Sequence, residues 1–251
     1  MNISLQKTGT QPPKGWQKAD TKKKTEAIIK KLSELQNLLY ANKKHSVLII
    51  LQGMDASGKD GVLKNVFSYF NPRSIQVHSF TAPTEEEKAH DFLWRAHLRT
   101  PAKGMIQIFN RSYYDDVLVT RVHKWCSDDK AKHRMKSINE FEHLLHKDNH
   151  TQILKFYLHT SKKEQEKRIQ ERVDNPSKHW KYDVNDYKEM ALREEYIRMY
   201  EDVFSNCNYL PWEIVPADKN WYKEYVIAKT LLDALEDLDM KYPPLPEETT
   251  L

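Results

Sequence analysis

Apolar residues follow two patterns along the chain, and the two patterns alternate. Five short segments are continuously apolar, or alternate apolar with polar residues, as strands do when a sheet buries them. These predicted strands are 46–51, 75–80, 105–109, 151–159 and 212–216. The segments between them carry apolar residues at helical spacing, which predicts helices over 21–43, 59–70, 84–97, 113–122, 131–147, 161–173, 184–204 and 220–239. Strands that alternate with helices form right-handed βαβ units, so the predicted fold class is α/β, a five-stranded parallel sheet with helices on both faces.

Polar residues indicate helix starts and domain limits. Thr84 with Glu87, and Ser161 with Glu164, have the spacing of capping boxes. We expect residues 1–20, which contain two adjacent prolines and many lysines, to be loosely ordered. A single domain should span 21–240, with a lid at about 161–190, and a Pro-rich acidic tail should follow at 241–251.

Composition narrows the class of protein. Charged residues make up 30% of the 251 residues and hydrophobic residues 39%, which is typical of a soluble globular domain. No apolar run approaches the ~20 residues of a membrane span, and the N-terminus lacks the apolar core of a secretory signal. The two cysteines, Cys126 and Cys207, have no metal or redox spacing, which favours a cytoplasmic protein with reduced thiols.

The net charge of +4 is unevenly distributed. Residues 1–31 carry a net +6, residues 161–182 a net +3 and residues 233–251 a net −5. A basic segment that recurs deep in the chain suggests an anionic ligand. Three consecutive lysines at 22–24 come with no nucleic-acid recognition motif, so a nucleic-acid partner is not expected.

The segment "GMDASGKDG", 53–61, contains the first chemical motif. It follows a predicted strand and opens a predicted helix, which is the context of a phosphate-binding loop, and Lys59 has the place of the loop lysine. The next residue is Asp60 rather than Ser or Thr, so the usual hydroxyl ligand of Mg²⁺ is missing. A carboxylate can replace it, and we favour Asp55, within the loop, over Asp60, which could simply cap the helix dipole. The alternative is an ordinary strand-to-helix turn.

Three further segments follow predicted strands, where ligand sites of parallel sheets lie. After the third strand come Asn110, Arg111 and Asp115. Arg111 is a candidate clamp for a transferring phosphoryl group, and Asp115 a candidate to orient metal-bound water or activate an acceptor; the alternative is a helix start decorated with acids. After the fourth strand, a basic segment interrupted by proline looks like a mobile lid, although a solvated helix would have similar composition. In the helix after the second strand, Arg95 is a candidate anion contact, although that helix has enough apolar residues to be packing only.

Together these segments resemble the family-2 polyphosphate kinases, which move phosphoryl groups between inorganic polyphosphate and nucleotides. The matching blocks are "GMDASGKDG", "APTEEEKAHDFLWR", "IFNRSYYDDVLVTRVH", "ILKFYLHTSKKEQEKRIQER" and "KHWKY", collinear over about 45–225. The resemblance implies a three-layer α/β/α phosphate-loop kinase fold with a helical lid, dependence on Mg²⁺ with Mn²⁺ as an alternative, and a homo-oligomer, either a dimer or a tetramer. The helix at 21–43 is a candidate for its interface.

The resemblance also implies residue roles. Asp55, Lys59, Arg111 and Asp115 would be catalytic, with Asp55 and Asp115 as metal ligands. Nucleotide or phosphate contacts would come from Gly53, Ala56, Ser57, Gly58, Asp60, Arg95, Asn110 and Arg121. The lid would bind polyphosphate through Arg168, Arg172, Lys178 and Lys181. ADP-preferring relatives have Asp in place of Asn110, and the form "NRSYYDD" resembles the single-domain subgroup that accepts AMP as well as ADP.

The sequence therefore predicts a Mg²⁺-dependent enzyme that uses polyphosphate to convert ADP to ATP, and AMP to ADP. Two other functions stay open at this point. One is an ATP-dependent nucleotide monophosphate kinase of the thymidylate-kinase type, which would share the loop and the lid. The other is a non-catalytic module that binds polyanions or nucleotides, which the departures at Asp60 and Asn110 would allow.

Overall fold

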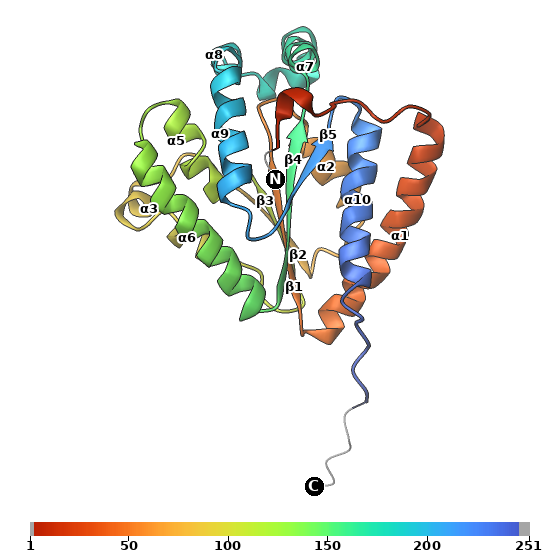
Figure 1. Cartoon of the computed structure of the whole chain (residues 1–251). Helices are drawn as coiled ribbons and strands as arrows, with labels where there is room; N and C mark the ends of the chain where they lie inside the picture. The colour runs from red at the N-terminus through yellow and green to blue at the C-terminus, as the bar shows by residue number, and fades with distance from the viewer. Residues whose placement is uncertain (1–2, 246–251) are drawn as a thin grey trace.

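The computed structural model describes residues 3–245 and contains one parallel sheet of five strands in the order β2-β3-β1-β4-β5 (Figure 1). The strands are β1 (Ser46–Gln52), β2 (Ile75–Ser79), β3 (Ile106–Asn110), β4 (Thr151–His159) and β5 (Trp212–Pro216). All four pairings are parallel, with β1 at the centre between β3 and β4. The predicted fold class is confirmed.

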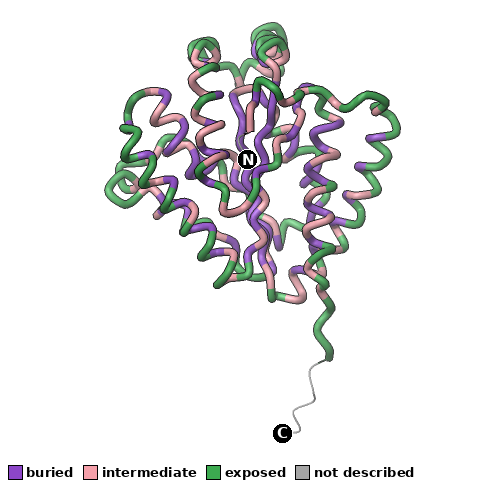
Figure 2. The backbone as a smooth tube through the Cα atoms, viewed as in Figure 1, coloured by how far each residue is buried: buried purple, intermediate pink, exposed green. Residues whose placement is uncertain are grey.

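Alternating side chains of the central strand face two separate cores. Leu48 and Ile50 of β1 belong to one apolar cluster, whereas Val47, Ile49 and Leu51 belong to the other. Both faces of a parallel sheet must be covered, which explains why this strand is continuously apolar. Figure 2 shows the buried strands running through the middle of the molecule, with exposed positions on the outer sides of the helices.

The helices form a layer on each face of the sheet (Figure 1). One layer contains α1 (Lys18–Asn42), α2 (Lys59–Val66) and α10 (Asn220–Glu236), which contribute to the cluster around Ile49. The other contains α6 (Asp128–Lys147) and α9 (Arg193–Asn206), which contribute to the cluster around Ile50. Leu32 and Leu39 of α1 are buried in this cluster, Ile28 and Leu35 pack against it, and α1 contacts α10. The role of this helix in an oligomer interface stays a prediction.

Three predicted helices are interrupted, and those predictions were wrong in extent. The segment 84–97 divides into α3 (Glu85–Ala89) and α4 (Trp94–His97). The segment 113–122 divides into a 3₁₀ turn, η2 (Tyr113–Asp116), and α5 (Val119–Val122). The segment 184–204 divides into α8 (Asp186–Ala191) and α9.

Hydrogen bonds accompany two of these interruptions, one local and one to a distant residue. The carboxylate of Asp91 accepts from the backbone N–H of Leu93 at 2.9 Å, a local bond that competes with helix formation. Tyr113 and Tyr114 are adjacent, yet both hydroxyls donate to Glu142, at 3.0 and 2.6 Å, which holds the chain in a tighter turn than an α-helix. The spacing of apolar residues, from which the helices were predicted, indicates neither of these hydrogen-bonding arrangements.

The segment expected to be a lid contains α7 (Lys162–Asp174), the 3₁₀ helix η3 (Pro176–Lys181) and α8. Ser161 caps α7 by accepting from the backbone N–H of Glu164 at 3.2 Å. The predicted capping box is incomplete, because the Ser161 N–H donates to Asp218 at 2.8 Å and Glu164 pairs with Arg168 instead. The box of Thr84 and Glu87 is complete, as predicted.

Residues 3–17, which were expected to be loosely ordered, pack against the rest of the chain. The segment begins with the turn η1 (Leu5–Lys7), and Leu5 is buried, with its backbone N–H donating to Glu201 at 2.7 Å. Thr10 and Gln11 both donate to Asp218, at 2.8 and 2.7 Å, at the carboxyl end of β5. Of the predicted acidic tail, 241–245 is exposed, and 246–251 lies outside the described residues.

Within residues 3–245, none of the helices combines the length and the apolar character that crossing a membrane requires.

Candidate active site

A cavity of about 730 Å³ lies at the carboxyl ends of the strands. The loop after β1, the end of β3, the lid segment and the first turn of α10 line it. Eight Lys or Arg residues and seven Asp or Glu residues contribute to the lining. The lining is therefore highly charged but almost balanced in sign, which distinguishes it from the simple basic groove that the sequence suggested.

Glycines shape the loop between β1 and α2. At Gly53 (φ 153°), an added Cβ would lie 2.8 Å from Ser57 Oγ and 3.1 Å from the Leu158 carbonyl oxygen, so no larger residue fits. Gly58 is the N-cap of α2 and has φ 93°, in the left-handed region that favours glycine. The loop thus turns sharply enough for the N-terminus of α2 to point its backbone N–H groups into the cavity, as anion-binding loops do.

Lys59 lies behind this loop rather than in open solvent. It is buried, and Nζ donates to the carbonyl oxygens of Gly53 at 2.8 Å and Met54 at 3.3 Å. Burial lowers the pKa of Lys59 to about 8. The role of Lys59 as the phosphate-loop lysine stays a prediction.

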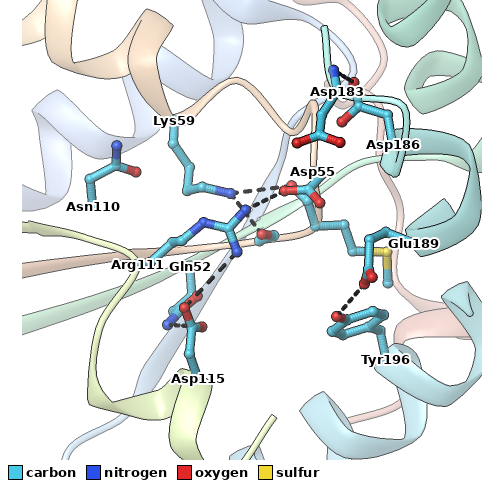
Figure 3. Close-up of polar contacts among 12 residues, drawn as sticks. Gln52, Asp55, Lys59, Asn110, Arg111, Asp115, Asp183, Asp186, Glu189 and Tyr196 are labelled. Atoms are coloured by element: carbon cyan, nitrogen blue, oxygen red, sulfur yellow. Dashed lines mark hydrogen bonds and ion pairs between the residues drawn. The ribbon is translucent and has the colours of Figure 1, made fainter. Parts of the chain in front are cut away.

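Arg111 lies between the two predicted metal ligands (Figure 3). One guanidinium nitrogen makes a short ion pair with Asp55, and the other is 4.0 Å from Asp115. Arg111 has φ 63°, a conformation that costs energy for a residue with a side chain and that is concentrated at functional sites. Its backbone N–H donates to the Leu51 carbonyl at 3.0 Å, which fixes the end of β3 against β1.

The two carboxylates have different electrostatic environments. Burial alone would raise the pKa of Asp55, but Arg111 and Lys59 hold it below its usual value. Burial raises the pKa of Asp115, with Arg111 opposing the shift, and Gln52 donates to the Asp115 carboxylate at 3.2 Å. Asp55 is therefore ionised at neutral pH, and its side chain keeps 27% of its surface exposed to the cavity.

A buried network holds η2, and with it Asp115. Glu142 accepts from both tyrosines of η2 and from Lys155 Nζ at 2.8 Å, and neither charged side chain of that pair is exposed. Lys155 also donates to the Tyr114 hydroxyl at 3.1 Å and to the Cys207 carbonyl at 3.0 Å.

We expect Lys155→Met to destabilise the protein by about 3–5 kcal/mol, because Glu142 would be left as a buried charge without its partner. Urea unfolding measures the change in free energy. Lys147→Met, at an exposed position on α6, is the matched control and should change stability by under about 0.5 kcal/mol. Equal stability of the two variants would contradict the role of this ion pair.

Asp60 and Asn110 connect the loop, the sheet and the lid. Lys181 of η3 donates to Asp60 at 2.9 Å, and Asn110 donates to Ser79 at 3.2 Å and more weakly to Asp60 at 3.5 Å. Asp60 thus forms an ion pair with the lid, which is neither of the two roles considered for it from the sequence. The Oδ1 atom of Asn110 is buried and has no hydrogen-bond partner among the described residues.

Each predicted lid cation has a carboxylate partner that the sequence analysis did not identify. The pairs are Arg168 with Glu164, Arg172 with Asp186, Lys178 with Glu171 and Lys181 with Asp60, all at 2.9 to 3.0 Å. The Arg172 pair uses both carboxylate oxygens of Asp186. A polyanion in this cavity would consequently meet acids as well as bases.

The structure brings most of the predicted site residues together. Twelve line the cavity: Asp55, Ala56, Ser57, Gly58, Lys59, Asp60, Asn110, Arg111, Arg168, Arg172, Lys178 and Lys181. Gly53 and Asp115 line a small adjoining recess, which Asp55 and Arg111 share. Arg95 and Arg121 line neither: Arg95 donates to the Thr81 carbonyl and Asp116, and Arg121 pairs with Asp128 and Asp202.

Lys223 and Asn220, in the first turn of α10, line the cavity and were missed. A signal was available, because α10 follows β5 and its N-terminus must lie at the same edge of the sheet as the loop. The residues predicted for the site come only from the segments after the first four strands.

The carboxylate oxygens in the cavity fit a Mg²⁺ ion only if the ion takes most of its ligands from water and from the substrate. Among residues 3–245, no group of three or more His, Cys, Asp or Glu side chains is arranged to hold a metal by itself. Asp55 and Asp115 supply carboxylate oxygens, and Mg²⁺ characteristically combines one or two carboxylates with water and phosphate oxygens. The residues present therefore fit a metal that is bound together with a phosphorylated substrate.

A parallel α/β sheet, a glycine loop with a buried lysine, and a charged helical segment over the same cavity define the class of phosphate-loop kinases. Within that class, the chain belongs to the polyphosphate kinase 2 family: the family model described as Polyphosphate kinase 2 (PPK2) matches residues 15–243.

Individual relatives agree with this assignment. An AMP/ADP-polyphosphate phosphotransferase of Meiothermus ruber is 46% identical over 218 residues, which cover 86% of this chain and 81% of the relative. An ADP-polyphosphate phosphotransferase of Rhodopseudomonas palustris is 41% identical, covering 86% of this chain and 79% of that one. The crystal structure of Polyphosphate Kinase 2 from Arthrobacter aurescens TC1 superposes with a TM-score of 0.94 at 39% identity, covering 98% of this chain and 89% of that chain.

Proposed function

We propose that this enzyme transfers phosphoryl groups from inorganic polyphosphate to AMP and ADP in a Mg²⁺-dependent reaction. The observation that carries the proposal is the Asp55–Arg111 pair above the phosphate loop, in a cavity whose cations and acids nearly balance. The names of the two relatives described above, which act on AMP and ADP or on ADP, support these acceptors.

Binding and orientation account for most of what the chain's own residues do. The N–H groups of the loop and the Lys59 ammonium hold the phosphates at the start of α2, while Arg111 stabilises charge on the phosphoryl group in transfer. Lid residues Arg172, Lys178 and Lys181 exchange part of their bonding from their carboxylate partners to the polyphosphate chain. We expect the segment 161–190 to move as a lid when these side chains exchange partners.

Asp55 and Asp115 would hold Mg²⁺. When bound, the ion offsets phosphate charge and polarises the phosphoryl oxygens. Asp55 is ionised and reaches the cavity, so it is the primary ligand in this proposal. Arg111 must release part of its ion pair with Asp55 when a metal binds there.

The transfer itself needs no general base. A terminal phosphate oxygen of AMP or ADP, already ionised at neutral pH, attacks the terminal phosphorus of polyphosphate. The new P–O bond forms as the bridging P–O bond breaks, and polyphosphate shortened by one unit leaves with the bridging oxygen and its electrons. Phosphoryl transfer depends mainly on alignment and on charge stabilisation, which the loop and Arg111 supply.

An assay with polyphosphate as the only phosphoryl donor tests the proposal. With Mg²⁺ and long-chain polyphosphate, we expect ADP from AMP and ATP from ADP, both detected by chromatography. Parallel reactions without polyphosphate, or with ATP replacing it as the donor to AMP, are the controls. Product formed only with ATP would instead support a monophosphate kinase of the thymidylate-kinase type, and polyphosphate binding without any product would support a non-catalytic module.

Two further features stay predictions from the family. We propose a homo-oligomer, a dimer or a tetramer, which light scattering of the purified protein would measure. We also propose a cytoplasmic location, with which the two buried free thiols, Cys126 and Cys207, agree.

A further inference from the structure

Side-chain donors hold the carbonyl groups of the phosphate loop. From Gly53 to Gly58, every backbone carbonyl oxygen accepts a hydrogen bond from a side-chain donor outside the segment. The donors are Lys59 to residues 53 and 54, Gln165 to residue 55, Arg168 to residues 56 and 57, and Lys223 to residues 57 and 58. A peptide whose carbonyl points away from the cavity points its N–H toward it, so this arrangement aims the loop amides at a bound anion.

Lys223 is the donor that no motif explains. Its side chain is fully buried, and Nζ donates to the carbonyl oxygens of Ser57 at 3.4 Å and Gly58 at 3.1 Å, and to Asn220 Oδ1 at 3.0 Å. All three of these acceptors are neutral oxygens. An added Cβ at Gly58 would lie only 2.2 Å from Nζ, so glycine at this position is what allows the ammonium to reach the loop backbone.

Two physical costs oppose a lysine at this position. A buried ammonium without a carboxylate in contact loses its hydration and is not compensated by an ion pair. The first turn of α10 also presents the positive end of the helix dipole to the ammonium. A methionine would fill the same space without either cost. The positive charge of Lys223 is therefore expected to serve the function of the loop, because an anion bound at the loop would offset both costs.

We propose that Lys223 is a positioning residue of the phosphate loop, which fixes the Ser57 and Gly58 carbonyls so that the loop N–H groups face the phosphates of the substrate. It acts through its hydrogen bonds to the loop backbone. The inference rests on the proposed assignment of residues 53–58 as the phosphate-binding loop.

The electrostatic surroundings of Lys223 agree with this role. Burial, and then the nearby Arg168, lower the pKa of Lys223 to about 7. Lys59 also opposes its charge, whereas Glu224 and Glu164 favour it. Bound phosphate would raise this pKa again, so above pH 7 the site should take up a proton at Lys223 when a polyanion binds.

The inference is tested by isothermal titration calorimetry, which measures the affinity of the Lys223→Met variant for inorganic tripolyphosphate in the presence of Mg²⁺. We expect the dissociation constant to rise about 10-fold or more, comparable to the loss of a supporting group behind a binding site. Lys229→Met, on the exposed side of the same helix, is the matched control and should bind as the wild type does. Titrations at pH 8 in two buffers of different ionisation enthalpy measure the protons taken up when tripolyphosphate binds. This number should be smaller for Lys223→Met than for the wild type. Replacement of a residue with only a structural role would not change it.

The outcomes separate this inference from the assignment of the loop. If Lys59→Ala loses tripolyphosphate binding but Lys223→Met binds with wild-type affinity and proton uptake, the role of Lys223 is overturned while the loop assignment stands. If Lys59→Ala also binds normally, the loop assignment itself fails. If Lys223→Met does not fold, Lys223→Gln, which keeps a donor without the charge, replaces it. Wild-type affinity together with wild-type proton uptake in folded Lys223→Gln would equally overturn the inference.

Discussion

Lys59→Ala is expected to abolish phosphoryl transfer from polyphosphate to ADP, with a loss on the order of 1000-fold in kcat/KM. The ammonium lies behind the phosphate loop and donates to the Gly53 and Met54 carbonyls, so its removal takes away both a positive charge and a support of the loop. Initial rates of ATP formation measure the effect. Lys64→Ala, at an exposed position on the same helix, should retain wild-type turnover.

The same residue predicts a pH dependence. Because burial lowers the pKa of Lys59 to about 8, its charge is present below that pH and lost above it in the free enzyme. We expect kcat/KM to fall as the pH rises through about 8, with a smaller fall in kcat because bound phosphate favours the charged form. Retention of full activity in Lys59→Ala, or a profile of the wild type that rises through this range, would contradict the assignment of the loop lysine.

Asp55→Asn is expected to reduce transfer on the order of 1000-fold, because the amide keeps the size of the side chain but removes the charge that would bind Mg²⁺. The variant also loses its ion pair with Arg111, which lines the same cavity. Rates measured over a range of Mg²⁺ concentrations should show that saturating metal does not restore turnover.

Asp129→Asn, at an exposed carboxylate in the first turn of α6, is the control for a lost surface charge and should be fully active. Thermal unfolding of both variants separates a lost fold from a lost metal ligand. If folded Asp55→Asn showed wild-type rates at the Mg²⁺ concentration that half-saturates the wild type, Asp55 would have no role as a ligand.

The strands and the loop could be predicted because their signals are local. A strand buried on both faces is expected to be mainly apolar, as 47–51 is, and the glycines of the loop are required by backbone geometry at Gly53 and Gly58. These features depend on a few consecutive residues. The five strands consequently appear in the structure within a residue of their predicted limits.

Features that depend on distant residues were not predictable in the same way. The interruption at η2 depends on Glu142, which comes from another helix, and the packing of the N-terminus depends on Asp218 and Glu201 near the other end of the chain. Lid lysines and arginines are visible in the sequence as a basic segment, 161–182. Two of their partners, Glu164 and Glu171, lie within it, but the other two, Asp60 and Asp186, lie outside it. Charge balance in the cavity is a property of the assembled fold.

The cavity contains almost as many acids as bases. We propose that carboxylates of the loop region recruit Mg²⁺, and that the metal allows a polyanion to bind there. The most direct measurement is the affinity for tripolyphosphate with and without Mg²⁺, in the wild type and in Asp55→Asn. The account predicts that Mg²⁺ tightens binding to the wild type at least about 10-fold and leaves the affinity of the variant nearly unchanged. An equal gain from Mg²⁺ in both proteins would contradict it.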